Sequence, residues 1–159
     1  MTARPFEEIV AEHGPVVIRV CRAMLGPHDG EDAWSETFLA ALRAYPGLRP
    51  DSNVRGWLLT IAHHKAIDLI RRRDRAPRPT AELPDLSTWD EVPDADPALR
   101  QALDALPPKQ RGAVVYRYLA DLPYAEIGEL LGSSETAARR SAADGVAKLR
   151  TAYLKGSPR

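Results

Sequence analysis

Two neighbouring arginines, Arg139 and Arg140, stand near the start of an alanine-rich segment without proline, which is typical of a helix. A guanidinium can pair with both acceptors of a guanine edge, and such a bidentate contact is worth about 1–3 kcal/mol of discrimination. The first turns of a helix that lies in the major groove approach the base edges. The side chains expected in such a groove are those of Ser134, Glu135, Thr136, Arg139 and Arg140.

The element that must position these arginines is a pair of helices joined at Gly132. Apolar residues from 124 to 131 keep the spacing of one helical face, and Pro123 stands just before the start. Gly132 can adopt the positive φ that commonly follows a helix, and Ser133 or Ser134 can cap the next one. This pattern is typical of a DNA-binding helix-turn-helix, with an αα-hairpin in an ordinary helical core as the alternative.

The net charge of the 159 residues is zero, but the charges are not spread evenly. Residues 55–78 carry 7 Lys or Arg against 2 Asp or Glu, and residues 107–159 carry 9 against 5. Between them, residues 79–106 carry 1 against 7. Each basic segment can therefore make phosphate contacts of its own.

Composition predicts an all-α chain of one domain or two small ones. Runs of alternating β-branched residues are almost absent, and the 14 prolines are clustered. The single cysteine, Cys21, excludes an intramolecular disulfide and fits a reducing compartment. No signal peptide precedes the first helix and no apolar run approaches the roughly 20 residues that cross a bilayer. We therefore expect a cytoplasmic protein without membrane insertion.

Two helices are predicted before the first basic segment. Residues 6–25 keep helical spacing, with a bend or restart expected at Gly14-Pro15. The next helix is expected over residues 30–45, with Asp29 as a candidate cap. Its acidic residues gather in the first half, where the helix dipole favours them. They form either a solvated face or a docking surface for a basic partner.

The helix predicted over residues 55–73 is the basic one. His63 and His64 are expected to point to solvent together with the three arginines at its end. Basic side chains suit a phosphate backbone, and Asn53 or Trp57 could hydrogen-bond or stack an exposed base. The alternative is that the terminal arginines only complement the helix dipole.

The sequence shows none of the patterns of an enzyme or of a metal site. His63 and His64 are adjacent, so on a helix their side chains point about 100° apart. His13, Cys21 and His28 lack the spacing of zinc ligands. There is no glycine-rich phosphate loop and no nucleophile motif. We therefore expect no catalytic residue, no cofactor and no metal.

Three segments in order resemble the extracytoplasmic-function (ECF) sigma factors of bacterial RNA polymerase. They are EDAWSETFLAALRA, RGWLLTIAHHKAIDLIRRR and LPPKQRGAVVYRYLADLPYAEIGELLGSSE. The resemblance implies two small helical domains, residues 1–73 and 98–155, the second containing the helix-turn-helix. Between them, residues 74–97 are rich in proline and acidic residues, which predicts a flexible linker.

The resemblance also implies a function, namely binding of core RNA polymerase and promoter-specific transcription initiation. The first domain would dock on the polymerase and melt the -10 element, and the second would read the -35 element with the groove residues above. The docking residues implied are Asp32, Glu36, Thr37, Phe38 and Leu39. The -10 residues implied are Asn53, Val54, Arg55, Trp57, His63, His64, Arg71, Arg72 and Arg73. Among these, the loop of residues 48–54 would capture a flipped base.

The chain departs from the family pattern at two places. His64 stands where asparagine is usual, and Ser141, Ala143 and Asp144 replace residues that are often basic or bulky. Two other functions therefore stay open, a helix-turn-helix regulator that binds DNA without polymerase and a sigma-like decoy that binds polymerase without starting transcription. The resemblance also implies an anti-sigma factor as a partner.

Overall fold

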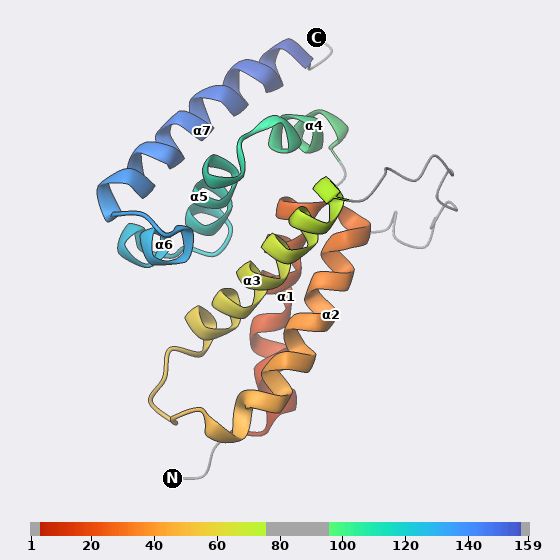
Figure 1. The fold of residues 1–159 in the computed structure, drawn as a ribbon, viewed down its shortest axis with the longest axis vertical. Coiled ribbons are helices and arrows are strands. Elements are labelled where there is room, and N and C mark those ends of the chain that lie inside the picture. The colour runs from red at the N-terminus through yellow and green to blue at the C-terminus, as the bar shows by residue number, and fades with distance from the viewer. Residues whose placement is uncertain (1–3, 76–95, 157–159) are drawn as a thin grey trace.

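The structure is a computed structural model that describes residues 4–75 and 96–156 (Figure 1). All regular elements in these residues are helical, which confirms the prediction of an all-α chain. They are α1 (Phe6–Leu25), α2 (Pro27–Ala44), the 3-10 turn η1 (Tyr45–Gly47), α3 (Val54–Arg75), α4 (Pro97–Ala105), α5 (Pro108–Tyr118), α6 (Tyr124–Leu131) and α7 (Glu135–Gly156). Most of the segment predicted as a linker, residues 76–95, lies outside the described residues. None of the described helices has the length and apolar character needed to cross a membrane.

The first three helices form one bundle, in which α1 lies beside α2 and α3 (Figure 1). α1 runs unbroken through Pro15, so the restart expected at Gly14-Pro15 does not occur. Its middle is buried, and the indole Nε1 of Trp34 donates to the carbonyl of Gly14 at 3.1 Å. Tertiary packing therefore holds the helix together across the missing N–H of the proline.

α2 begins at Pro27, earlier than the expected start at residue 30. Proline suits the first helical turn because the N–H that it lacks would have no partner there. Gly26 supplies the positive φ of 89° that lets the chain turn from α1 into α2. Asp29 is therefore not the cap of α2 but a residue of its first turn. At Gly30 a Cβ would lie 2.7 Å from Cα of Arg22, so α1 and α2 approach closely there.

The last four helices form a second bundle, and α7 lies along α4, α5 and α6 (Figure 1). Asp96 caps α4, its carboxylate accepting from the backbone N–H of Ala98 at 3.0 Å. Tyr116, Ile127 and Ala138 are fully buried there and belong to one apolar cluster. Over the described residues, α4 to α7 thus form the second small helical domain that the resemblance implies, with α6 and α7 as its helix-turn-helix.

The two bundles also contact each other. α1 packs against α4 and α5, and α3 touches α6. Buried apolar residues form one cluster that continues from the first bundle into the second. The surfaces predicted to bind DNA therefore lie on two bundles that are in contact with each other.

Candidate nucleic-acid and polymerase interfaces

The turn between α6 and α7 is built as the sequence predicts. Gly132 ends α6 in the left-handed conformation, with φ of 68° and ψ of 35°. Ser134 Oγ accepts from the backbone N–H of Ala137 at 3.0 Å and so caps α7. A Cβ at Gly128 would lie 2.8 Å from the carbonyl oxygen of Ser133, so the turn packs directly on α6. The angle between the two helices is thus fixed by backbone contact.

The predicted -35 residues share one exposed surface at the start of α7. All five side chains are exposed. Arg139 forms an ion pair with Glu135, Nη2 to Oε1 3.2 Å, and its Cζ lies 4.8 Å from the ring centroid of Tyr124. Asp144 is exposed two turns beyond Glu135 on the same helix. The arrangement offers two cations and two hydroxyls to a groove, with the carboxylate of Glu135 beside Arg139.

The predicted -10 residues are divided by α3 into exposed, half-buried and buried positions. Arg71 and Arg72 are exposed, as are Arg55, His64 and Asn53. Val54 and Trp57 are half-buried, because both pack against the core cluster of the first bundle. The polar side chains at the two ends of α3 are therefore accessible in this arrangement.

His63 is buried, so the expectation that it points to solvent is wrong for this arrangement. Its imidazole Nδ1 lies 2.7 Å from the hydroxyl of Tyr116, a residue of the second bundle. The two rings meet edge to face with centroids 5.5 Å apart. Helical spacing placed His63 on the outer face of the first bundle, and the second bundle covers that face.

We expect acid to weaken the His63 contact. Burial, aided by the neighbouring His64, lowers the pKa of His63 from 6.5 to about 4. Above pH 6.5 the imidazole of His63 is neutral in both the folded and the unfolded chain, so its buried contact contributes fully to the free energy of unfolding. As the pH falls from 6.5 toward about 4, the imidazole takes up a proton in the unfolded chain but not in the folded one. The free energy of unfolding therefore falls by up to about 1.4 kcal/mol per pH unit.

The measurement is the urea midpoint of the whole chain between about pH 7 and pH 5, compared with that of His63→Gln. His63→Gln should show a smaller loss on acidification, whereas the control His28→Gln, at an exposed position away from His63, should follow the original chain. Equal pH dependence in all three proteins would contradict the buried, neutral state of His63.

Asn53 serves as a cap in addition to its predicted role. Its Oδ1 accepts from the backbone N–H of Gly56 at 3.1 Å, at the first turn of α3. Its Nδ2 lies 3.4 Å from Oε1 of Glu126 in α6. The loop predicted to capture a base therefore touches the helix-turn-helix.

Three arginines from other helices converge on the carboxyl end of α1, a feature that the sequence did not reveal. The last carbonyls of a helix lack partners within it and carry the negative end of its dipole. The donors are Arg73 to Leu25, Arg100 to Arg22 and Ala23, and Arg111 to Met24. Two of these arginines belong to the second bundle, so the carboxyl end of α1 joins the bundles.

Arg111 is the most buried of the three, with 9% of its surface exposed. Besides the 2.9 Å bond to Met24, its Nε donates to the carbonyl of Leu103 at 2.9 Å. Its Nη2 donates to the carbonyls of Asp104 and Leu106, each at 3.1 Å. One guanidinium thus satisfies the ends of α1 and α4 together.

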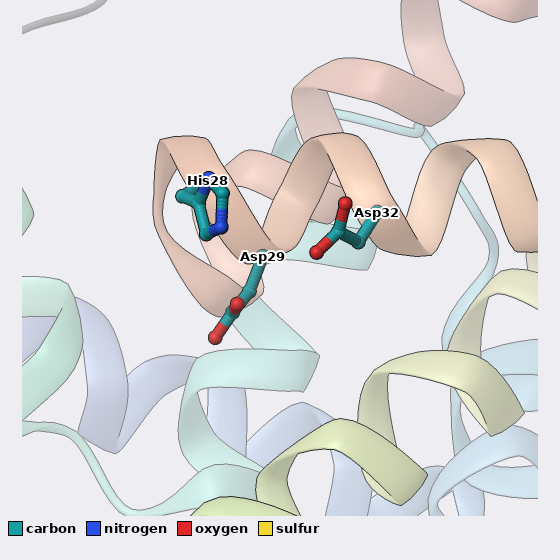
Figure 2. Close-up of side chains that lie close together, drawn as sticks. All are labelled: His28, Asp29 and Asp32. Carbon is teal, nitrogen blue, oxygen red and sulfur yellow. The ribbon is translucent and has the colours of Figure 1, made fainter. Parts of the chain in front are cut away.

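Arg73 also pairs with Asp29, Nε to Oδ2 2.6 Å. The side chains of His28, Asp29 and Asp32, at the start of α2, are of the types that can bind a metal ion (Figure 2). Their potential metal-ligating atoms lie within 4.8 Å of one another. Because His28 and Asp32 are exposed and Asp29 is engaged by Arg73, we assign this carboxylate to the ion pair.

α2 turns only part of the predicted docking set outward. Asp32 and Leu39 are exposed and Glu36 is half-buried. Thr37 is fully buried, its Oγ1 donating to the carbonyl of Ala33 at 2.6 Å. Phe38 packs within the aromatic group of the first bundle. The expectation that these two side chains contact a partner is therefore wrong for this arrangement.

Leu42 is a docking candidate that is not among the docking residues implied by the family resemblance. It is 52% exposed, and Leu39 is 55% exposed one turn before it. The signal in the sequence is a second leucine one turn after Leu39. Together with Asp32 and Glu36, the two leucines give α2 an exposed surface that is both apolar and acidic.

Two family models match the chain, each over one of the two bundles. Sigma-70 region 2 matches residues 9–76, and Sigma-70, region 4 matches residues 97–149. The second match contains the whole α6 to Gly132 turn and most of α7.

Curated proteins of the same kind are similar over most of this chain. RNA polymerase sigma factor CarQ of Myxococcus xanthus is 33% identical in an alignment of length 159 that covers 91% of this chain and 87% of CarQ. ECF RNA polymerase sigma factor SigE of Mycolicibacterium smegmatis is 36% identical over 141 residues. That alignment covers 80% of this chain and 53% of SigE, so the chain spans about half the length of that relative.

A solved structure shares the fold. The sigma factor RpoE from Bartonella quintana, in complex with the anti-sigma factor NepR, matches with a TM-score of 0.74 at 18% identity. The match covers 96% of this chain and 98% of RpoE. With both regions matched in order and two curated relatives above 30% identity, the chain belongs to the ECF sigma factors of bacterial RNA polymerase.

Proposed function

We propose that this chain binds core RNA polymerase and directs it to promoters by contacting DNA at two separate places. The observation that carries the proposal is the presence of both sigma-70 regions, each with an exposed cationic surface. On α3 these cations are Arg71 and Arg72, and on α7 they are Arg139 and Arg140. In the proposed division, residues 1–73 bind polymerase and the -10 element, residues 74–97 link the domains and residues 98–155 bind the -35 element.

Polymerase docking falls to the exposed surface of α2. Asp32 and Glu36 provide carboxylates for a basic partner helix, and Leu39 and Leu42 provide apolar area at its centre. Protein interfaces commonly have an apolar core and a polar rim, and two exposed leucines flanked by carboxylates fit that division. Thr37 and Phe38 support this surface from below rather than contact the partner.

Promoter melting requires the two bundles to separate. His63 lies under Tyr116, and Asn53 touches Glu126, so two of the proposed -10 residues are engaged by the second bundle. A base taken out of the stack needs an accessible pocket. We therefore regard the packed arrangement as a resting form, which polymerase and promoter together would open.

The proposed partners extend to an anti-sigma factor, and the proposed location is the cytoplasm. Both follow from membership of the family, whose members act on cytoplasmic RNA polymerase. RpoE, which shares the fold, was solved with its anti-sigma factor NepR. An anti-sigma factor would be expected to favour the packed arrangement, in which part of the -10 surface is covered.

The experiment is promoter-specific run-off transcription with core polymerase and the whole chain. The proposal predicts transcripts with defined start sites that depend on both the polymerase and this chain. A shift of promoter DNA without polymerase, and no transcript with it, would instead support a helix-turn-helix regulator. Polymerase binding without any transcript would support a decoy.

A further inference from the structure

Tyr124, the first residue of α6, contacts two arginines from different helices. The Cζ of Arg139, in α7, lies 4.8 Å from the centroid of its ring, and the Cζ of Arg117, in α5, lies 4.9 Å from it. Both distances fall within the range of about 6 Å over which a cation is attracted to an aromatic face. The ring is half-buried, so it packs on the core and still reaches the surface.

Arg117 anchors one side of this group. Its Nη1 donates to the carbonyl of Leu122 at 3.2 Å, in the turn just before α6. The guanidinium is therefore tied to the backbone while it lies against the ring of Tyr124. The ring of Tyr124 is therefore in contact with a guanidinium whose own position is fixed by the backbone of the turn before α6.

Arg139 makes two contacts at once on the protein surface. Along α7 it pairs with Glu135, a pair in which both side chains are more than half exposed. Such pairs contribute little and are screened by salt. Across the turn it lies on Tyr124, a contact that depends on the aromatic face and on partial burial. The aromatic contact is thus the one that can fix the side chain under cellular ionic conditions.

We infer that Tyr124 is a positioning residue that holds the guanidinium of Arg139 ready to read a base edge in the -35 element. This inference rests on the proposed function, in which Arg139 makes that contact. A bidentate contact needs the planar guanidinium in one orientation, and an arginine that is already ordered loses less freedom on binding. Tyr124 would therefore set discrimination at one -35 position without touching the base.

The test replaces Tyr124 in the full chain and measures transcription with core polymerase on promoters randomised across the -35 element. Tyr124→Leu and Tyr124→Met keep apolar volume and remove the aromatic face, whereas Tyr124→Phe keeps that face. Arg139→Ala first identifies the position that Arg139 reads. At that position we expect the preferred base to lose about two- to five-fold of its advantage in the Leu and Met variants, as loss of an exposed cation–π contact implies. The Phe variant should retain the preference.

The outcomes separate this inference from the function on which it rests. If Arg139→Ala changes preference at no -35 position, the proposed role of Arg139 fails. If Arg139→Ala removes a preference that the folded Leu or Met variant keeps, only the positioning role of Tyr124 is overturned. The positioning role is also overturned if Tyr124→Phe loses as much of the preference as the Leu and Met variants lose. The double variant Tyr124→Leu with Arg139→Ala should lose no more preference at that position than Arg139→Ala alone, because Tyr124 acts only through Arg139.

Discussion

Replacing Arg111 with methionine is expected to lower the free energy of unfolding by about 3–4 kcal/mol. The guanidinium donates to four carbonyl oxygens, three at the end of α4 and one at the end of α1. Methionine fills a similar volume but donates to none of them, so buried acceptors are left without a partner. The loss should be visible as a lower urea midpoint, followed by circular dichroism at neutral pH.

The control is Arg140→Met, the same replacement at an exposed position of α7. It should change the free energy of unfolding by less than about 0.5 kcal/mol. Arg111→Lys should fall between the two, since an ammonium keeps the charge but lacks the fork that reaches several carbonyls. If Arg111→Met were no more damaging than Arg140→Met, the convergence of arginines on α1 would not hold the bundles together.

Reversing the charge of Arg71 and Arg72 together should reduce open-complex formation on the order of 100-fold while polymerase binding persists. Both side chains are exposed at the end of α3, away from the docking surface on α2. Glutamates there would replace two phosphate contacts by repulsion. Each lost contact also lowers the magnitude of the slope of log K against log[salt] by about 0.7–0.9. Permanganate reactivity of unpaired thymines measures melting, and co-purification with core polymerase measures docking.

Arg73 is left unchanged in this variant because it joins α3 to Leu25 and Asp29, so its reversal would also disturb the fold. Arg19→Glu, on the exposed side of α1, provides a matched reversal outside the proposed DNA surface. It should melt the promoter as well as the original chain does. Unchanged melting with Arg71 and Arg72 reversed would remove the end of α3 from the -10 surface.

Local features of the chain were predictable because they depend on neighbours in the sequence. Gly132 takes the left-handed conformation, Ser134 caps α7, and the residues expected in the groove lie on one exposed surface. The family resemblance is confirmed by both regional matches, and with it the expectation that the chain is not an enzyme. The roles of the individual site residues stay predictions.

Features that depend on distant segments were not predictable from periodicity. His63 has the spacing of an outward residue on α3 and is buried only because Tyr116, 53 positions later, covers it. Arg111 follows Lys109 and Gln110 in the sequence, yet it is buried because helix ends from two bundles supply carbonyls to it. Thr37 and Phe38 were assigned to docking by position in the family, which does not specify the direction of a side chain.

The central claim is that the two bundles, each carrying a DNA-binding surface, pack together in the resting chain and move apart on a promoter. The most direct test is the distance between spin labels at Glu7→Cys on α1 and Ala147→Cys on α7, both exposed positions. The natural Cys21 is buried and its pKa is raised to about 12 by burial, so it should not take the label. We predict one narrow distance in the free chain and a different distance in the complex with polymerase and promoter. An unchanged distance in an actively transcribing complex would contradict the account.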